Sequence, residues 1–460
     1  MIKILVMINH HKIKQKIAIF KNYLFIILFL ALISFFGYKI LEIFPTITKE
    51  HDFQLFIFGS ILFLGYVINR SSPKTKIPSF VWLIFAGLAI QPLLSFFIEE
   101  KGLIRMMVEV IASLILFASG LEIPFGRFKR WFFPIFSLSF FGVILSSVLF
   151  STVIFYLFKF LGLINDSLVI ISLVLLSTAL ASTDPTAILP TLRNINLKRN
   201  FIKDIAISES ALTDVSGSIF TRFLILAFSA QAASQKSIID YFLPLVKKST
   251  YDALALQIIS GIVVGYFGYY LIKTFYKSPK KENHDIDPSL LIFVPIFTFF
   301  LGNVLGGAGF LAAFSAGLFS DLNEEVKKNF VFFDHFLNNL IKPVIFVVLG
   351  AMVPISIMIK TSLLGILIAL IFMFIIRPLV VFISLFPWII KGRFKPAEIL
   401  FLSFIRETGV IGAVLIIILV DSGIVNENIV LSLGMWIILL TLIIEPPLTP
   451  LVVKKIGLEK

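Results

Sequence analysis

The stretch Ala181-Ser182-Thr183-Asp184-Pro185-Thr186 interrupts an otherwise apolar segment, residues 167–192. A proline removes one helical hydrogen bond and disfavours helical geometry in the residue before it. Inside a membrane, unwound backbone is tolerated only where protein or a water-filled cavity covers it. The stretch therefore predicts a discontinuous helix whose break lines an ion site. The alternative is an ordinary kink at Pro185 beside a buried, paired Asp184.

A second polar stretch, Ser208-Glu209-Ser210-Ala211-Leu212-Thr213-Asp214, lies in the next apolar segment. Ser210 and Asp214 are four residues apart and share one face of a helix. A carboxylate and a hydroxyl on one face offer hard oxygen ligands, which suit an alkali cation. The same carboxylate can bind a proton instead. We therefore predict an ion- and proton-binding site at Asp214, and the alternative is a structural pair of acids held by an arginine.

The second half of the chain contains a comparable interruption, Arg406-Glu407-Thr408-Gly409, within the apolar segment 397–420. Interrupted helices at corresponding positions of two halves indicate an inverted-repeat transporter. No internal sequence identity is visible, so the repeat prediction rests on these two breaks. The alternative is that Arg406 pairs with an acid and that Gly409 is a packing residue.

The composition independently indicates a membrane protein. Of the 460 residues, 58% are hydrophobic and 15% are charged, whereas roughly 25% are charged in soluble proteins. A soluble enzyme or a disordered chain is thereby excluded. The chain has no Cys, so disulfides, thiolate metal sites and iron–sulfur clusters are excluded, and we predict no cofactor. We attribute the net charge of +13 to basic cytoplasmic loops rather than to nucleic-acid binding.

Apolar stretches long enough to cross a bilayer, about 20 residues each, recur along the whole chain. The fourteen candidates are 23–38, 54–69, 77–98, 103–121, 131–158, 167–192, 202–230, 253–275, 289–305, 307–319, 338–356, 363–390, 397–420 and 428–452. The longest connections between them leave no room for a soluble catalytic domain. The first candidate has the basic flank of a signal peptide but no convincing cleavage site, so we favour a retained helix.

Basic residues alternate in step with these candidates. With the N-terminus placed in the cytoplasm, the inside segments hold 26 Lys and Arg and the outside loops hold 8. This bias predicts that both termini are cytoplasmic, with a bacterial inner membrane as the default location. Two further cations lie within apolar segments. We interpret Lys342 as a side chain that snorkels to the interface, and Arg222 as an interfacial or paired residue.

At these residues the sequence resembles the monovalent cation:proton antiporter superfamily, and specifically its NhaP-like sodium/proton branch, over about residues 54–452. The most specific pieces are the stretches 182–187 and 208–214. The supporting pieces are Leu116–Glu122, Gly309–Phe314, Phe346–Gly350 and Arg377-Pro378.

The resemblance implies an all-α polytopic membrane protein. It implies thirteen core transmembrane helices in two inverted six-helix repeats, with two crossing discontinuous helices, plus the extra helix at 23–38. The implied divisions are the N-terminus with its extra helix at 1–53, the first repeat at 54–230, a linking helix and loops at 231–288, and the second repeat at 289–460. A homodimer is also implied, with an ion-carrying domain that moves as an elevator.

The resemblance also implies roles for particular residues. Asp214 would bind the cation or the proton, with Ser210, Asp184, Thr183 and Thr213 completing or supporting the site. Glu209 and Arg377 would form a structural ion pair beside it. The breaks in the two discontinuous helices would be marked by Pro185 and by Arg406, Glu407, Thr408 and Gly409.

One position departs from the family pattern. The branch usually has Asn before the essential Asp, and an electrogenic branch has Asp there, whereas this chain has Thr213. Because Thr cannot ionise, we expect electroneutral exchange of one Na⁺ or Li⁺ for one H⁺. We also expect the protein to contact membrane lipid. The alternatives are a K⁺/H⁺ antiporter of the same fold, or a channel or sensor that has lost exchange. A membrane enzyme is disfavoured because the five His lie in termini and loops.

Overall fold

The computed structural model describes residues 2–459 except for 45, 48–50, 76, 96–97, 99–100, 124, 165, 184–191, 193–194, 231–237, 247, 277–287, 321–323 and 406. These residues are helical almost throughout. The helices are α1 (Ile2–Ile43), α2 (His51–Ser71), η2 (Ser72–Lys74), α3 (Ser79–Ala89), η3 (Gln91–Leu94), α5 (Lys101–Leu121), α6 (Phe125–Arg130), α7 (Phe132–Phe136), η4 (Ser137–Phe141), α8 (Gly142–Phe160), α9 (Ser167–Ala179), α11 (Phe201–Ala230), η5 (Ile238–Val246), α12 (Lys248–Tyr276), α13 (Pro288–Val304), α14 (Gly309–Phe319), α15 (Glu324–Phe336), η6 (Leu337–Ile341), α16 (Lys342–Met352), α17 (Ile355–Lys360), α18 (Ser362–Ile371), η7 (Phe372–Ile376), α19 (Arg377–Ile390), α20 (Pro396–Phe404), α21 (Val410–Asp421) and α22 (Glu427–Lys455). The prediction of an all-α fold is confirmed.

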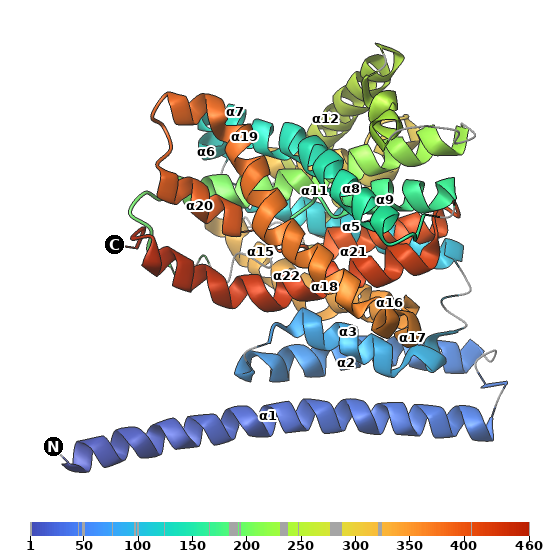
Figure 1. Cartoon of the computed structure of the whole chain (residues 1–460), viewed down its shortest axis with the longest axis vertical. Coiled ribbons are helices and arrows are strands. Elements are labelled where there is room, and N and C mark those ends of the chain that lie inside the picture. Colours follow the sequence, from blue (N-terminus) through green and yellow to red (C-terminus); the bar gives the residue numbers. More distant parts are fainter. Residues whose placement is uncertain are drawn as a thin grey trace. The chain divides into compact units, whose positions relative to one another are not determined.

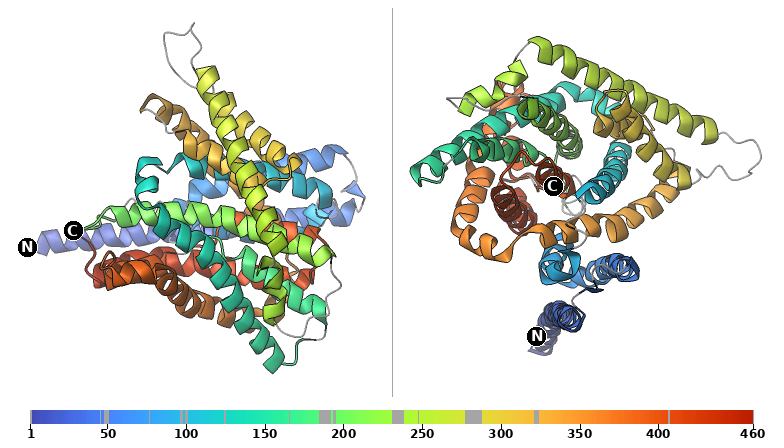
Figure 2. Two further views of the ribbon diagram at one scale, coloured as in Figure 1. Left: turned by 90° about the horizontal axis from the view of Figure 1, so that it is seen from above. Right: turned by 90° about the vertical axis from the view of Figure 1, so that its right-hand side faces the viewer.

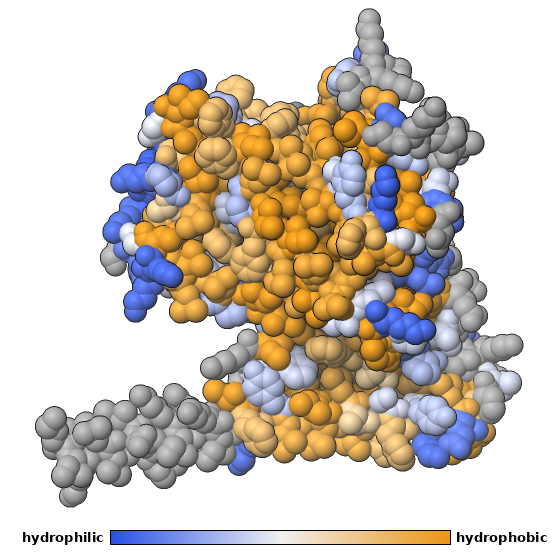
Figure 3. Space-filling model, in the orientation of Figure 1, coloured by the Kyte–Doolittle hydropathy of each residue, from blue (hydrophilic) through white to orange (hydrophobic). Residues whose placement is uncertain are grey.

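Many of these helices are suited to a membrane. Within the described residues, nine helical stretches are long and apolar enough to span a bilayer, and five shorter helices are also apolar. Each of the fourteen predicted segments overlaps one of them, but five are short, so the number of crossings stays a prediction. On the face shown in Figure 3, apolar residues cover most of the surface and hydrophilic ones gather at its edges. The protein is an integral membrane protein.

Contacts divide the chain into two compact units, and the first comprises residues 1–104 and 338–355. Helices α3 and α16 approach closely within it because two glycines leave no side chain between their backbones. A Cβ atom at Gly87 would overlap the Val347 carbonyl, and one at Gly350 would overlap the Ile84 carbonyl. Helix α2 packs beside this pair, and α1 contacts both α2 and α3 (Figure 1). This grouping leaves the predicted repeat boundaries untested.

Lys342 in this unit differs from our expectation. Its side chain is buried, with 1% of the residue exposed, so the interpretation as a snorkelling residue is wrong. The Lys342 ammonium donates a hydrogen bond to Asn338 Oδ1 at 2.7 Å. A buried ammonium group needs such an acceptor because its transfer out of water is otherwise costly.

The second unit comprises residues 105–337 and 356–460. Its central element is α11, shown in green in Figure 2, which contacts α7, η4, α8, α9, α14, α20 and α21. All residues from Ser208 to Thr221 are buried. Because this stretch is surrounded by protein, its acids and hydroxyls must find partners inside the fold or bind something that enters it.

The first predicted break lies partly outside the described residues. Helix α9 ends at Ala179, and residues 182–183 are non-helical. Asp184 and Pro185, on which the prediction depended, lie outside the described residues.

The second break is described on both sides. Helix α20 ends at Phe404, residues 407–409 are non-helical, and α21 begins at Val410. Arg406 lies outside the described residues. Gly409 precedes α21 with φ −115° and ψ −141°, which is far from helical geometry. Within this apolar segment the backbone is therefore unwound at Glu407 and Thr408.

Two π-turns share one sequence pattern. Leu337–Ile341 precede Lys342-Pro343, and Phe372–Ile376 precede Arg377-Pro378. Proline has no N–H, so a carbonyl one turn earlier loses its usual partner, and local π geometry helps to satisfy such groups. The Arg377 N–H accordingly bonds to the Phe372 carbonyl, five residues back. In the second unit this pattern fixes the position from which Arg377 projects.

Candidate ion-binding site

The polar residues of α11 point in different directions around its axis. Successive helical residues are about 100° apart. Counted from Thr213, Glu209 and Ser216 lie about 40° and 60° to one side, and Asp214 lies about 100° to the other. Side-chain hydrogen bonds and an ion pair anchor α11 on the side of Glu209, Thr213 and Ser216. Asp214 therefore projects away from the anchored side.

Thr213 ties α11 to the end of α9. The two hydroxyl oxygens of Thr213 and Thr183 are 2.7 Å apart, and the Thr183 N–H donates to Thr213 Oγ1 at 3.2 Å. The Thr213 hydroxyl itself donates to the Ser210 carbonyl at 2.7 Å. Its single proton is thereby used, so the Thr183 hydroxyl must be the donor between the two threonines. A hydroxyl accepts two hydrogen bonds and donates one, and Thr213 has reached that limit.

A glycine in α11 leaves room for the first break, and a glycine in α21 lies beside that break. A Cβ atom at Gly217 of α11 would lie 3.3 Å from Ser182 Cβ. One at Gly412, in the first turn of α21, would lie 3.8 Å from Ser182 Oγ. Ser182 and Thr183 at the first break thus lie between α11 and the second discontinuous helix.

Glu209 and Arg377 form a buried ion pair. Arg377 Nη2 donates to Glu209 Oε2 at 3.0 Å and to the Leu402 carbonyl at 3.2 Å. The side chains of Arg377 and Glu209 are 3% and 2% exposed, respectively. The guanidinium therefore joins α19 to α11 and to the last turn of α20, just before the second break. Loss of one partner from such a buried pair costs about 3–5 kcal/mol.

Two serines add a further connection that the sequence analysis missed. Ser139 Oγ in the π-turn η4 donates to the Glu209 carbonyl at 3.2 Å. Ser216 Oγ of α11 donates back to the Ser139 carbonyl at 2.5 Å. Both serines are buried. No local signal in the sequence links them, because 77 residues separate the pair.

Asp214 and Ser210 occupy a fully buried part of α11, with 1% and 0% of each residue exposed. Within the part of the chain that the structure describes, the Ser210 hydroxyl has no hydrogen-bond partner. The same is true of the Thr408 hydroxyl at the second break. A buried hydroxyl without a partner calls for a specific explanation, and the binding of an ion by that oxygen is one.

Glu407 and Asp184 complete the set of predicted site residues. Glu407 is buried at the second break, with 2% of the residue exposed. Asp184 lies outside the described residues, as do Pro185 and Arg406. The structure therefore brings together Thr183, Thr213 and the adjoining turn of α11.

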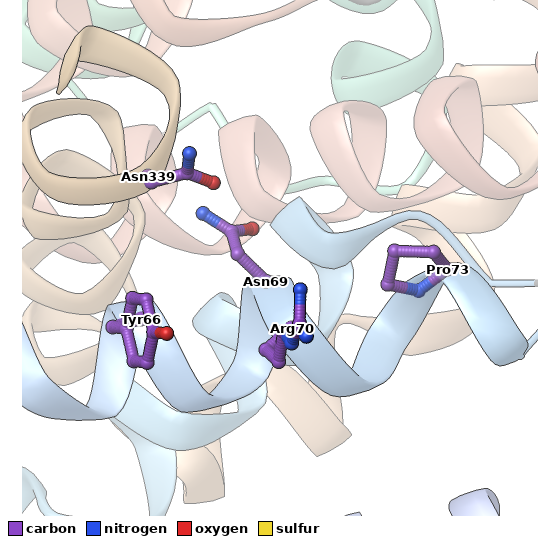
Figure 4. Close-up of a pocket in the computed structure, with 5 residues that line it drawn as sticks. All are labelled: Tyr66, Asn69, Arg70, Pro73 and Asn339. Atoms are coloured by element: carbon purple, nitrogen blue, oxygen red, sulfur yellow. The ribbon is translucent and has the colours of Figure 1, made fainter. Parts of the chain in front are cut away.

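A separate cavity has different chemistry. It has a volume of about 460 Å³ and lies in the first unit (Figure 4). It is lined by Tyr66, Asn69 and Arg70 of α2, by Pro73, and by Asn339 of η6. Among the residues that the structure describes, the lining offers a phenol, two amides and a guanidinium. The positive charge of Arg70 in this lining disfavours a bound cation.

The family comparison matches the chain over most of its length. The model of the transmembrane sodium/hydrogen exchangers matches residues 59–455. The chain belongs to the sodium/hydrogen exchanger family. The family resemblance predicted from the sequence is confirmed. Family and fold are those of a transporter that exchanges cations for protons.

Solved structures show the same fold. The chain is similar to the sodium proton antiporter MjNhaP1 from Methanocaldococcus jannaschii at pH 8, with 20% identity and a TM-score of 0.67. An electron-microscopy structure of MjNhaP1 matches with 22% identity and a TM-score of 0.63. Each match covers 88% of this chain and 98% of the other. At this identity the likeness concerns the fold alone.

Proposed function

We propose that this member of the exchanger family carries Na⁺ or Li⁺ in exchange for H⁺, with Asp214 binding one or the other. The observation that supports this most is the Ser210 hydroxyl. It is buried one helical turn before Asp214 and has no partner among the described residues. A cation held by the Asp214 carboxylate would give that oxygen a partner, because alkali cations take hard oxygen ligands.

The neighbouring residues support the site in different ways. Thr213 acts through Thr183, because its hydroxyl is saturated by three hydrogen bonds and has no capacity left for a cation. It holds the unwound backbone after α9 against α11, where Thr183 supplies further oxygens, and we expect Asp184, the next residue in the sequence, to support the site. Glu209 and Arg377 fix the orientation of α11 as a structural pair.

A single titrating carboxylate makes the exchange electroneutral. Thr213 cannot ionise, so Asp214 carries one proton or one monovalent cation, and both loaded forms are neutral. The empty carboxylate is penalised in the low dielectric of the membrane interior. This penalty couples the two ions, because only a loaded site crosses. We propose that the loaded site crosses by an elevator movement of α11 together with the discontinuous helices. We further propose that the protein is a homodimer in a bacterial inner membrane, with both termini on the cytoplasmic side.

The test is the dissipation of a pH gradient in proteoliposomes, followed with a fluorescent proton probe as Na⁺, Li⁺ or K⁺ is added. Asp214→Asn should abolish the response. Asp204→Asn is the matched control, because Asp204 lies on the same helix and pairs with Arg127 at 2.8 Å. Sodium-dependent proton flux that persists in Asp214→Asn would reject Asp214 as the carrier.

The same preparation distinguishes the alternatives. A response to K⁺ alone would keep the mechanism and change the substrate. No response to any of the three cations over a range of pH would favour a channel or sensor. An imposed membrane potential should leave the exchange rate unchanged, and a rate that follows the potential would exclude one-for-one exchange.

A further inference from the structure

A chain of alternating charges runs through the second unit at the end of α11 opposite its first turn. Arg222 Nη2 on α11 donates to Glu109 Oε1 on α5 at 2.7 Å. Glu109 Oε1 also accepts from Arg105 Nε at 3.4 Å, and Arg105 Nη1 donates to Asp421 Oδ2 at 3.1 Å. Two acids and two arginines alternate, so this chain of four charged side chains is neutral overall. Asp421 is the last residue of α21.

The Arg222 guanidinium also contacts an amide and two aromatic rings. Its Nη1 donates to Asn303 Oδ1 of α13 at 3.0 Å, and the same oxygen accepts from the Gly309 N–H of α14 at 3.2 Å. The guanidinium carbon lies 4.4 Å from the Phe310 ring centroid and 5.4 Å from that of Phe299. A cation over aromatic faces at these distances is attracted by the ring electrons. Helices α5, α13 and α14 thus all hold one side chain of α11.

These ion pairs connect two helices next to the proposed ion site, α11 and α21, to α5. α11 carries Asp214, and α21 follows the second break. Both are tied to α5, through Glu109 and Arg105 respectively. Arg222 is eight residues beyond Asp214, which is about 12 Å along the helix. The distribution of basic residues places this end on the outer side of the membrane.

We propose that Arg222 is a positioning residue for exchange, and that its pairing with Glu109 keeps the path between Asp214 and the outer side closed. This inference rests on the proposed function, because it requires Asp214 to face the two sides in turn. For the site to open outward, α11 and α21 must shift against α5, and the chain of charges must then separate. The Arg222 and Glu109 side chains are 25% and 11% exposed, so water can take the place of the lost partners when they part.

The absence of Cys from the chain makes a direct test available. Ser218 lies between Asp214 and Arg222, about 40° from each around the helix axis. It is fully buried, and Ser218→Cys introduces a single thiol there. A membrane-impermeant maleimide is applied to intact cells for the outer side and to inverted vesicles for the cytoplasmic side, without a sodium gradient. Labelling requires no exchange, so it reports the outer closure even if the proposed ion exchange is absent.

Glu109→Gln keeps the shape of the side chain but removes its charge. In the Ser218→Cys background it should raise the outer labelling rate about tenfold, as expected for loss of one charge-assisted hydrogen bond. Cytoplasmic labelling should fall in the same variant. Asp421→Asn, which breaks the other end of the chain of charges, should act in the same direction and serves if Glu109→Gln folds poorly.

Arg127→Gln is the matched control. It removes an arginine that pairs with Asp204 in the first turn of α11, at the opposite end of the helix, and should leave outer labelling unchanged. An increase on both sides would indicate a loosened helix and would contradict the proposal. The proposal would be overturned if the rate of labelling from the outer side were the same in Glu109→Gln and Asp421→Asn as without these substitutions. Absence of outer labelling in all of these proteins would count as the same rate.

Discussion

Replacement of Ser210 by alanine tests the site with little effect on the rest of the fold. The Ser210 hydroxyl is buried and makes no hydrogen bond within the described residues. Its removal should therefore leave the stability of the ion-free protein unchanged or slightly higher, since an unsatisfied buried polar group costs about 1–3 kcal/mol. Sodium binding should weaken, because one oxygen ligand is lost.

The size of the loss follows from the charge on the ligand. Interactions of a polar group with a charged one contribute about 1.5–3 kcal/mol, which corresponds to about a tenfold to 150-fold rise in the Kd for Na⁺. Thermal unfolding in detergent, followed by tryptophan fluorescence at increasing Na⁺, measures both quantities, because a ligand that binds the native state raises the unfolding temperature. The Na⁺-dependent rise should shift to higher concentrations in Ser210→Ala.

Ser218→Ala is the control for this experiment. Ser218 lies two turns further along the same helix, and its hydroxyl donates to the Val215 carbonyl at 2.7 Å. It should leave the Na⁺ dependence unaltered. A Ser210→Ala protein that is strongly destabilised without Na⁺, yet keeps the wild-type Na⁺ dependence, would refute the assignment of Ser210 as a ligand.

Substitutions at two further positions separate structural support from ion binding. Glu209→Ala should lower stability by about 3–5 kcal/mol because it leaves Arg377 buried without its carboxylate, with a smaller effect on Na⁺ affinity; a stable variant with weakened binding would reverse that role. Thr213→Val should destabilise by about 1–3 kcal/mol because the Thr183 N–H loses its acceptor, whereas Thr213→Ser retains the oxygen and should stay near wild type in the same unfolding assay. Equal effects of the two Thr213 variants would indicate packing rather than hydrogen bonding.

The sequence predicted the architecture well because a membrane restricts the choices. Apolar segments must be helices there, and a proline or a glycine among charges marks where a helix stops. The break at Glu407–Gly409 lies where the polar residues predicted it. The pairing of Glu209 with Arg377 could be expected only through the family resemblance, since 168 residues separate them.

Side-chain partners were harder to predict. A lysine near a helix end usually reaches the interface, but Lys342 is buried, and Asn338, one turn earlier, accepts a hydrogen bond from it. Arg222 was expected to be interfacial or paired, and its partner Glu109 is 113 residues away. The role of Thr213 as a saturated hydrogen-bond centre was also invisible, because only its distance to Thr183 reveals it.

Proton release on Na⁺ binding tests the central claim, that one carboxylate binds either ion. Calorimetric titration of the detergent-solubilised protein with Na⁺, in two buffers of different ionisation enthalpy, gives the number of protons released per bound cation. At a pH at which Asp214 is protonated before Na⁺ is added, the account predicts close to one, and no Na⁺ binding heat in Asp214→Asn. Na⁺ binding that releases no proton at any pH at which it occurs, or proton release that persists in Asp214→Asn, would contradict it.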